Sequence, residues 1–239
     1  MTLRKQRLEL LLKNRGLGTA LFHPVDPPEQ RFSTGIESLD LLLSGGFPRG
    51  HISEISGPIS SGKTSLMLTL LSRATQQGEV VACIDTNQLD PFSAQCSGMD
   101  LEKLLWIRCQ QEDQILKAGD ILCRAGNFGI IALDLHLSPG GSLTAGSHIW
   151  FRLQRAVEET RTVLLMFTPR PIARNAARTA IQLRRCDLQW RGGRVFWKLL
   201  QGFSIEVRSA SHRSQVIRSQ VSSLQTLDIR PADLMTCDL

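Results

Sequence analysis

The sequence lacks any apolar run long enough to cross a membrane. None of its stretches approaches the roughly 20 consecutive apolar residues that a spanning helix needs. Near the start, the leucines within residues 8–12 are interrupted by Glu9 and form too short a stretch for a secretory signal. We therefore expect a cytoplasmic protein with no membrane partner.

The cysteines lack the spacing of a metal site or of a disulfide framework. The six are Cys83, Cys96, Cys109, Cys123, Cys186 and Cys237. No two of them form a C-x-x-C pair, and no His-x₃₋₅-His stands nearby to complete a zinc site. We expect reduced, mostly buried thiols.

Charge is distributed unevenly along the 239 residues. The net charge is +6, but residues 152–218 alone carry fourteen basic and four acidic side chains, a local net charge of +10. Such asymmetry is typical of a polyanion-binding face. A basic surface that only keeps the protein soluble fits the same numbers.

Length and composition favour one core with two extensions. The predicted core covers residues 31–207, between an N-terminal helix and linker over 1–30 and a polar tail over 208–239. Leucines favour a helix near the start, and three prolines predict the linker that follows it. The N-terminal helix either docks on another chain or packs on its own domain. For the polar tail, the sequence predicts no structure beyond possible short helices.

One continuous stretch fits the phosphate-loop pattern G-x-x-x-x-G-K-[ST] at every specified position. It consists of Gly57, Pro58, Ile59, Ser60, Ser61, Gly62, Lys63 and Thr64, with Ser65 next. Alternating residues 50–56 predict a strand before it, and apolar residues 64–71 predict a helix after it. Backbone N–H groups, Lys63 and the helix N-terminus would hold nucleotide phosphates, and Thr64 would ligate Mg²⁺.

The rest of the core alternates between strand and helix patterns. Buried strands are predicted over 79–85, 129–134 and 162–167, helices over 33–43, 112–126 and 147–160, and a loop over 138–146. This alternation predicts an α/β fold with a largely parallel central sheet flanked by helices. Asp134 ends its strand in the Walker B form and is the second predicted Mg²⁺ ligand. Asp85, Thr86 and Asn87 are expected near the phosphates, because ligands gather at the carboxyl ends of parallel strands.

Two basic segments follow the last of these strands. Arg170, Arg174 and Arg178 are four residues apart, which predicts a helix with one basic face. Residues 186–190 and 195–199, joined by a glycine turn, predict a hairpin. Its basic residues Arg191, Arg194 and Lys198 interleave with tryptophans, a pattern that suits phosphates and bases of single-stranded DNA. A core hairpin with a solvated tip is the alternative.

Five segments together resemble the core of the RecA recombinase family. They are Ser33-Thr34-Gly35, Leu39-Asp40, the phosphate loop, Ile84-Asp85 and Leu89-Asp90-Pro91. The likeness is specific over residues 31–105, weaker to residue 200 and absent afterwards, where RecA carries a further domain. It implies a RecA-like fold, ATP and Mg²⁺ as ligands, binding to single-stranded DNA, a homo-oligomer and a role in DNA repair or recombination.

Three departures from RecA bear on activity. Asn87 stands where RecA has its catalytic glutamate, and an amide cannot take a proton from the attacking water, so we expect at most a weak DNA-dependent ATPase. Thr168-Pro169 replaces the Asn-Gln pair that senses the γ-phosphate in RecA. The chain from Pro169 to Ala180 is also too short, and has no glycine, for the second DNA-binding loop of RecA.

With these departures the chain looks like the ImuA-type accessory proteins of bacterial translesion synthesis, which belongs to the SOS response. That resemblance implies an accessory or regulatory factor, with a translesion polymerase or another repair protein as partner. The intact Lys63-Thr64 pair departs from many members of that group. An active single-stranded-DNA-dependent ATPase or recombinase, and a non-catalytic interaction module, are the alternatives.

Overall fold

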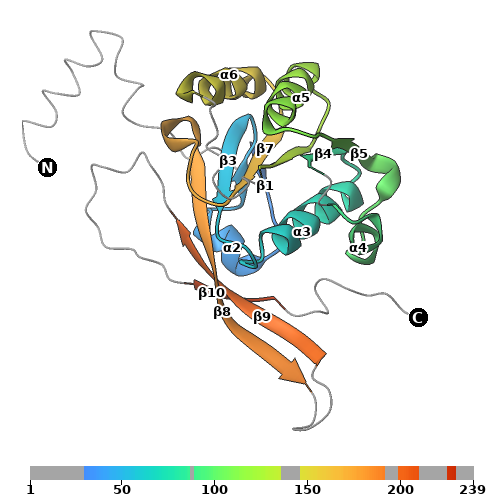
Figure 1. Cartoon of the computed structure of the whole chain (residues 1–239), viewed down its shortest axis with the longest axis vertical. Helices are drawn as coiled ribbons and strands as arrows, with labels where there is room; N and C mark the ends of the chain where they lie inside the picture. The colour runs from blue at the N-terminus through green and yellow to red at the C-terminus, as the bar shows by residue number, and fades with distance from the viewer. Residues whose placement is uncertain (1–29, 87–88, 136–145, 192–198, 210–224, 230–239) are drawn as a thin grey trace, which may run out of the picture.

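A central β-sheet lies between two layers of helices (Figure 1). The computed structural model describes residues 30–86, 89–135, 146–191, 199–209 and 225–229. Strands and helices alternate along most of this chain, so the predicted α/β fold with a largely parallel, helix-flanked sheet is confirmed. In this part of the chain no helix is both long and apolar enough to cross a membrane.

The sheet is parallel over most of its width. The order of the described strands is β10-β9-β8-β3-β7-β6-β4-β5. Six of them are parallel: β3 (His51–Ser56), β4 (Val81–Asp85), β5 (Leu104–Arg108), β6 (Ile130–Asp134), β7 (Val163–Thr168) and β8 (Thr179–Arg191). Two antiparallel strands extend it, β9 (Leu199–Ser209) and β10 (Gln225–Ile229). A separate short ribbon pairs β1 (Arg31–Phe32) with β2 (Phe47–Pro48).

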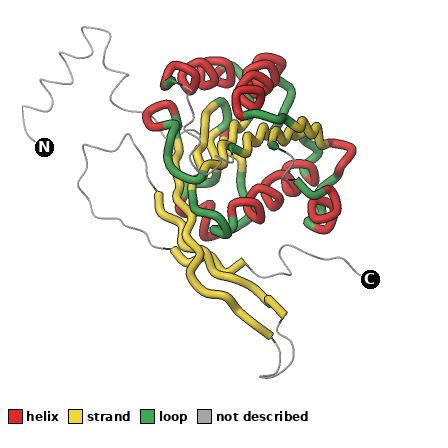
Figure 2. Tube along the Cα trace, in the orientation of Figure 1, coloured by secondary structure: helices red, strands yellow, loops and turns green. Residues whose placement is uncertain are grey.

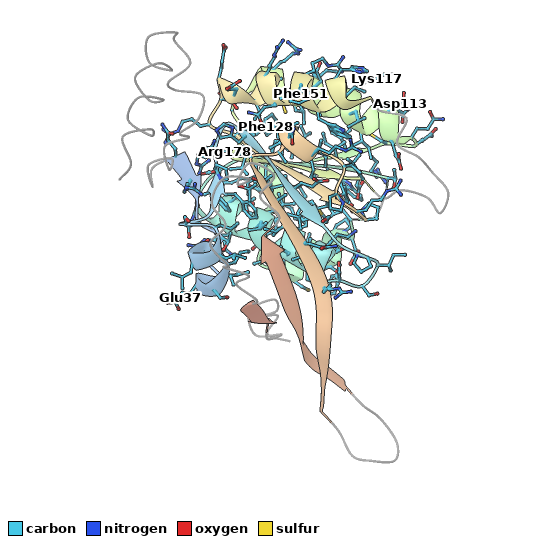
Figure 3. All side chains as sticks on the ribbon, turned by 90° about the vertical axis from the view of Figure 1, so that its left-hand side faces the viewer. Glu37, Asp113, Lys117, Phe128, Phe151 and Arg178 are labelled. Atoms are coloured by element: carbon cyan, nitrogen blue, oxygen red, sulfur yellow. The ribbon has the colours of Figure 1, made fainter. Side chains whose placement is uncertain are left out.

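The helices cover the two faces of the sheet in separate groups. One face carries α2 (Glu37–Leu42), α3 (Lys63–Gln76) and α4 (Pro91–Cys96), and the other carries α5 (Glu112–Ala125) and α6 (Ser147–Glu158). Figure 3 shows the separation, with Asp113, Lys117 and Phe151 of α5 and α6 at one end of the view and Glu37 of α2 far from them. One-turn 3₁₀ helices occur at Leu101–Lys103 (η2) and Arg174–Ala176 (η3).

Strand alternation divides the core between the two faces. In β4, Val81 and Cys83 pack into the cluster under α3, whereas Ala82 and Ile84 pack into the cluster under α5 and α6. All four are fully buried. A strand covered on both sides needs apolar residues at every position, which explains its continuous apolar run.

The helix predicted over residues 33–43 is shorter than expected. It covers Glu37–Leu42, and Ile36 at its N-cap provides no side-chain cap. The hydroxyls of Ser33 and Thr34 instead donate to the Asp40 carboxylate at 2.7 and 2.8 Å. These bonds fold the preceding turn back onto the helix. Ser33 and Thr34, which were predicted to begin the helix, therefore lie in the turn before it.

The sequence patterns missed the short ribbon of β1 and β2, the 3₁₀ turn η2 and three larger elements. The edge strand β5 is only partly buried and lacks a clean apolar run. Helix α4 has six residues and begins at Pro91, where Asp90 accepts a hydrogen bond from the Ser93 amide at 2.9 Å. Strand β10 lies in the segment for which no strand was predicted, and it pairs with β9.

The predicted basic helix over residues 170–178 is wrong. Strand β7 ends at Thr168, a single 3₁₀ turn covers Arg174–Ala176, and β8 begins at Thr179. Pro169 and Pro171 disfavour helix, and Arg174 adopts a left-handed conformation with φ 46°. The three arginines therefore do not share one helical face.

The predicted hairpin is confirmed in its first strand and in antiparallel pairing, whereas residues 195–198 of its second predicted segment lie outside the described residues. Its first segment, 186–190, lies inside β8, which pairs antiparallel with β9 from Ile181 opposite Ser209 to Arg191 opposite Leu199. Figure 2 shows these strands, in yellow, extending beyond the helical layers. The turn with Arg194 and Lys198 lies outside the described residues, as do the predicted N-terminal helix and linker and nearly all of the predicted 138–146 loop.

Candidate nucleotide-binding site

The phosphate loop connects two buried elements at the carboxyl edge of the sheet. Strand β3 ends at Ser56, and α3 begins at Lys63. The turn requires left-handed backbone at Ser60 (φ 62°) and at Gly62 (φ 88°), the N-cap of α3. The predicted order of strand, loop and helix is thus confirmed, and the free N–H groups of α3 point toward the loop.

Gly57 is where the loop touches the sheet most closely. Its amide donates to the Thr168 carbonyl at 3.0 Å. A Cβ placed on it would lie 2.7 Å from the Leu183 carbonyl oxygen of β8 and 2.6 Å from Ser61 Oγ. Only glycine permits this approach of loop to strand, which keeps the loop close to the end of β7 and to Leu183 within β8.

Lys63 lies inside the loop and is almost fully buried, with 9% exposure. Its ammonium donates to the carbonyls of Gly57 at 2.7 Å and Thr168 at 3.0 Å. An ammonium has three donors, so one remains for a ligand without breaking either bond.

Asp134 lies near Lys63, as expected for a phosphate loop and a Walker B strand. Burial lowers the pKa of the Lys63 ammonium, and the negative charge of Asp134 opposes that shift. Asp134 itself is 7% exposed at the end of β6. A buried ammonium that is only partly compensated is stabilised by an anionic ligand, which a triphosphate would supply.

Other loop residues also fit a triphosphate. In the described chain Ser61 Oγ is buried and has no hydrogen-bond partner, so a polar ligand atom would satisfy it. Thr64 is exposed in the first turn of α3, and Ile59 is 78% exposed at the tip of the loop. No group of three or more His, Cys, Asp or Glu side chains in the described residues could hold a metal, so Mg²⁺ here would depend on Thr64, Asp134 and phosphate oxygens.

Asp85 is engaged in holding the chain that follows β4. Its carboxylate accepts the Leu89 amide at 2.7 Å and the Trp106 indole N–H at 2.9 Å. It ends β4 at the carboxyl edge of the sheet, and these two bonds tie that end to Leu89 and to Trp106 of β5; its position near the phosphates stays a prediction. Asn87 lies outside the described residues.

Glu54, a buried carboxylate in the strand before the phosphate loop, was not identified from the sequence. It is 1% exposed in β3, and its Oε1 accepts the Ile172 amide at 2.6 Å, the Ala173 amide at 3.2 Å and the Thr168 hydroxyl at 3.3 Å. The sequence feature that could have identified it is a carboxylate in a predicted parallel strand, because both faces of such a strand are buried and a charge there needs partners.

The candidate DNA-contacting arginines fall on the connection between β7 and β8. Arg170 and Arg174 are exposed, whereas Arg178 is half-buried and its amide donates to the Ile52 carbonyl at 2.9 Å. Arg191 ends β8, away from this connection in the sequence, and its side chain lies outside the described set.

Comparisons with known proteins agree with this arrangement. A family profile described as the RecA N-terminal domain matches residues 18–141. Protein RecA of Corynebacterium aurimucosum is 42% identical over 110 residues, which cover 45% of this chain and 29% of that protein. Protein RecA of Thermus thermophilus is 38% identical over 143 residues, which cover 57% of this chain and 42% of the relative.

A crystal structure of the RadB recombinase resembles the chain in fold. The TM-score is 0.57 at 18% sequence identity, over 77% of this chain and 91% of that one. The matches to the RecA proteins span less than half of those proteins.

Proposed function

The chain belongs to the RecA N-terminal domain family, and from that premise we propose that it is an ATP-binding protein of DNA repair that acts as an accessory or regulatory factor. The observation that carries the proposal is the burial of Lys63 inside an intact phosphate loop, beside Asp134. The finer role proposed is in translesion synthesis during the SOS response, with a translesion polymerase or another repair protein as partner.

Each loop residue has a defined task toward ATP and Mg²⁺. Lys63 would neutralise phosphate charge, and the amides of residues 57–65 would donate to phosphate oxygens. Thr64 and Asp134 would hold Mg²⁺, which when bound offsets the charge of the phosphates. Left-handed backbone at Ser60 and Gly62 sets the course of the loop between β3 and α3.

The accessory role is supported by the residues around the site. Asn87 lacks the basicity of a glutamate. The connection between β7 and β8 contains ten residues, 169–178, and closes on Glu54 through its backbone, leaving little chain for a DNA-binding loop of the RecA kind. Exposed Arg170 and Arg174 remain available to single-stranded DNA.

Two alternative functions make different predictions. An active single-stranded-DNA-dependent ATPase or recombinase would hydrolyse ATP rapidly when DNA is added. A non-catalytic interaction module would bind its protein partner equally well with and without ATP. The proposal also includes a homo-oligomer and a cytoplasmic location. Its domain limits are 1–30, 31–207 and 208–239.

Calorimetry with ATP·Mg²⁺ tests the nucleotide site. Lys63→Ala should weaken binding at least about 100-fold, because it removes two charge-assisted hydrogen bonds to phosphate, each of about 1.5 kcal/mol or more. Lys117→Ala is the matched control, because Lys117 is an exposed lysine on α5 that pairs with Asp113 at 2.9 Å. Equal affinity of the Lys63→Ala variant and the wild type would rule out this site.

Nucleotide dependence of partner binding tests the accessory role. Capture of a purified translesion polymerase by the full chain should strengthen with ATP, and the gain should disappear in Lys63→Ala. Equal polymerase binding with and without ATP would favour the interaction module. Rapid ATP hydrolysis that DNA stimulates would favour the ATPase.

A further inference from the structure

A hollow of about 490 Å³ opens at α2 and at the turns on either side of this helix. Its lining residues are Gly35, Glu37, Asp40, Leu41, Ser44 and Gly45. None of these six belongs to the phosphate loop, so the hollow is separate from the proposed ATP site. Glu37 and Leu41 are four residues apart, which places them one turn from each other on the same side of the helix.

Leu41 forms an apolar wall of this hollow. It is 69% exposed, whereas Leu39 and Leu43 on the opposite side of the helix are buried in the core under α3. A single exposed leucine on a convex surface needs no explanation. A leucine that lines a concave surface is different, because such a surface suits an apolar side chain from another segment.

The polar edge of the hollow is acidic. The Asp40 carboxylate is occupied by the turn before the helix, where it accepts the hydroxyls of Ser33 and Thr34 at 2.7 and 2.8 Å. Glu37 is exposed, and its carboxylate has no hydrogen-bond or ion-pair partner among the described residues. A segment that fills the hollow would therefore match it best with one cation beside apolar side chains.

The residues that follow β10 are long enough to reach this hollow. Strand β10 ends at Ile229, and it contacts α2, next to which Figure 1 draws it. Five residues of strand span about 17 Å, whereas the ten residues 230–239 extend over as much as about 33 Å. Residues 230–239 therefore reach the hollow whichever end of β10 lies against α2.

The composition of residues 230–239 matches the hollow. Arg230 is the first residue after β10 and the one basic side chain of this stretch, and Leu234, Met235 and Leu239 are apolar. Pro231 favours extended backbone at Arg230, which carries the chain onward from the strand. A segment tethered this closely meets its site at an effective concentration of about millimolar, an advantage that a second copy of the chain does not have.

We propose that residues 230–239 dock in the α2 hollow of their own chain, with Arg230 beside Glu37 and with their apolar side chains over Leu41. Docking removes Leu41 from water and gives the Glu37 carboxylate a cationic partner. It uses no residue of the phosphate loop, so this inference does not depend on the proposed function.

Photo-cross-linking from position 41 in the full chain tests the docking. Leu41→p-benzoyl-phenylalanine places a photoreactive group in the hollow, and irradiation should join it to residues 230–239. The matched control carries the same group in place of Ile121, which is 66% exposed on α5 on the other face of the sheet. The yield from position 41 should be at least about tenfold higher, because only there does the tethered segment have a raised local concentration.

An equal mixture of isotopically labelled and unlabelled chains identifies the occupant. Cross-links within one chain join two fragments with the same label, and this is the expected result. Fragments with mixed labels would show that a second copy fills the hollow, which would overturn the inference. Equal yields from positions 41 and 121, or no cross-link from position 41 to residues 230–239, would overturn it as well.

Charge reversal tests the ion pair within the docked arrangement. Glu37 is exposed, so Glu37→Lys leaves the core intact. It should lower the cross-link yield from position 41 about two- to fivefold, the range expected for a surface ion pair. Arg230→Glu in the same chain should restore the yield. An unchanged yield in Glu37→Lys, or no recovery in the double variant, would refute the pairing of Arg230 with Glu37.

Discussion

Replacing Gly57 by alanine should damage both folding and ligand binding. The added Cβ would lie 2.7 Å from the Leu183 carbonyl oxygen, which belongs to a central strand and cannot rotate away. Contact with Ser61 Oγ at 2.6 Å is less serious, because a hydroxyl can turn. Forcing an extra methyl into a packed site costs about 1–3 kcal/mol, so the free energy of unfolding should fall by that amount.

The same shift should weaken ATP binding. Moving the loop away from β8 misaligns its amides, and loss of one charge-assisted hydrogen bond of about 1.5–3 kcal/mol lowers affinity about 10- to 150-fold. Denaturant unfolding and calorimetry measure the two effects on the same sample.

Gly78→Ala separates the two effects. Gly78 has φ 87° and nothing within 4 Å of an added Cβ, so its replacement costs stability through backbone strain of about 1–2 kcal/mol but leaves the loop intact. We expect lower stability with wild-type ATP affinity in this variant. Wild-type stability and affinity in Gly57→Ala would refute the close contact of the loop with β8.

Three further predictions address hydrolysis, DNA and thiol chemistry. Asn87→Glu should speed ATP hydrolysis about 10²- to 10⁴-fold by supplying a general base; rapid wild-type turnover unchanged by the substitution would show that another residue is the base. Arg170→Ala with Arg174→Ala should flatten the salt dependence of single-stranded DNA binding by about 1.4 units, at about 0.7 per phosphate contact; fluorescence anisotropy with an unchanged slope would rule these contacts out. Burial, with a smaller effect of Asp120, raises the pKa of Cys123 from 9.0 to about 12, so stability from this group is present below pH 9 and is lost as pH rises through 12. At pH 8, maleimide should therefore label half-buried Cys109 well before Cys123, and equal rates would contradict the burial of Cys123.

Local sequence patterns determined most of the α/β core. The phosphate loop is one continuous stretch, so its glycines, lysine and threonine were identifiable without neighbours in space. Buried parallel strands have continuous apolar runs, which predicted β4, β6 and β7 to within two residues at each end. The exposed edge strand β5 has no such run, and it was missed.

The basic segment shows where local patterns fail. Arginine spacing alone favoured a helix, but Ile172 and Ala173 give their amides to Glu54, more than a hundred residues earlier in the chain. Those bonds exist only because β3 lies between β7 and β8 in the sheet. The periodicity of a sequence carries no information about such partners.

The sequence by itself determined the loop chemistry and the alternation of strands and helices, because both depend on residues that are neighbours along the chain. The tertiary structure alone decided that Asp85 accepts the Leu89 amide and the Trp106 indole N–H, and that Glu54 accepts the backbone amides of Ile172 and Ala173. The order of strands in the sheet and their register bring those residues together, and both are set by packing among distant segments.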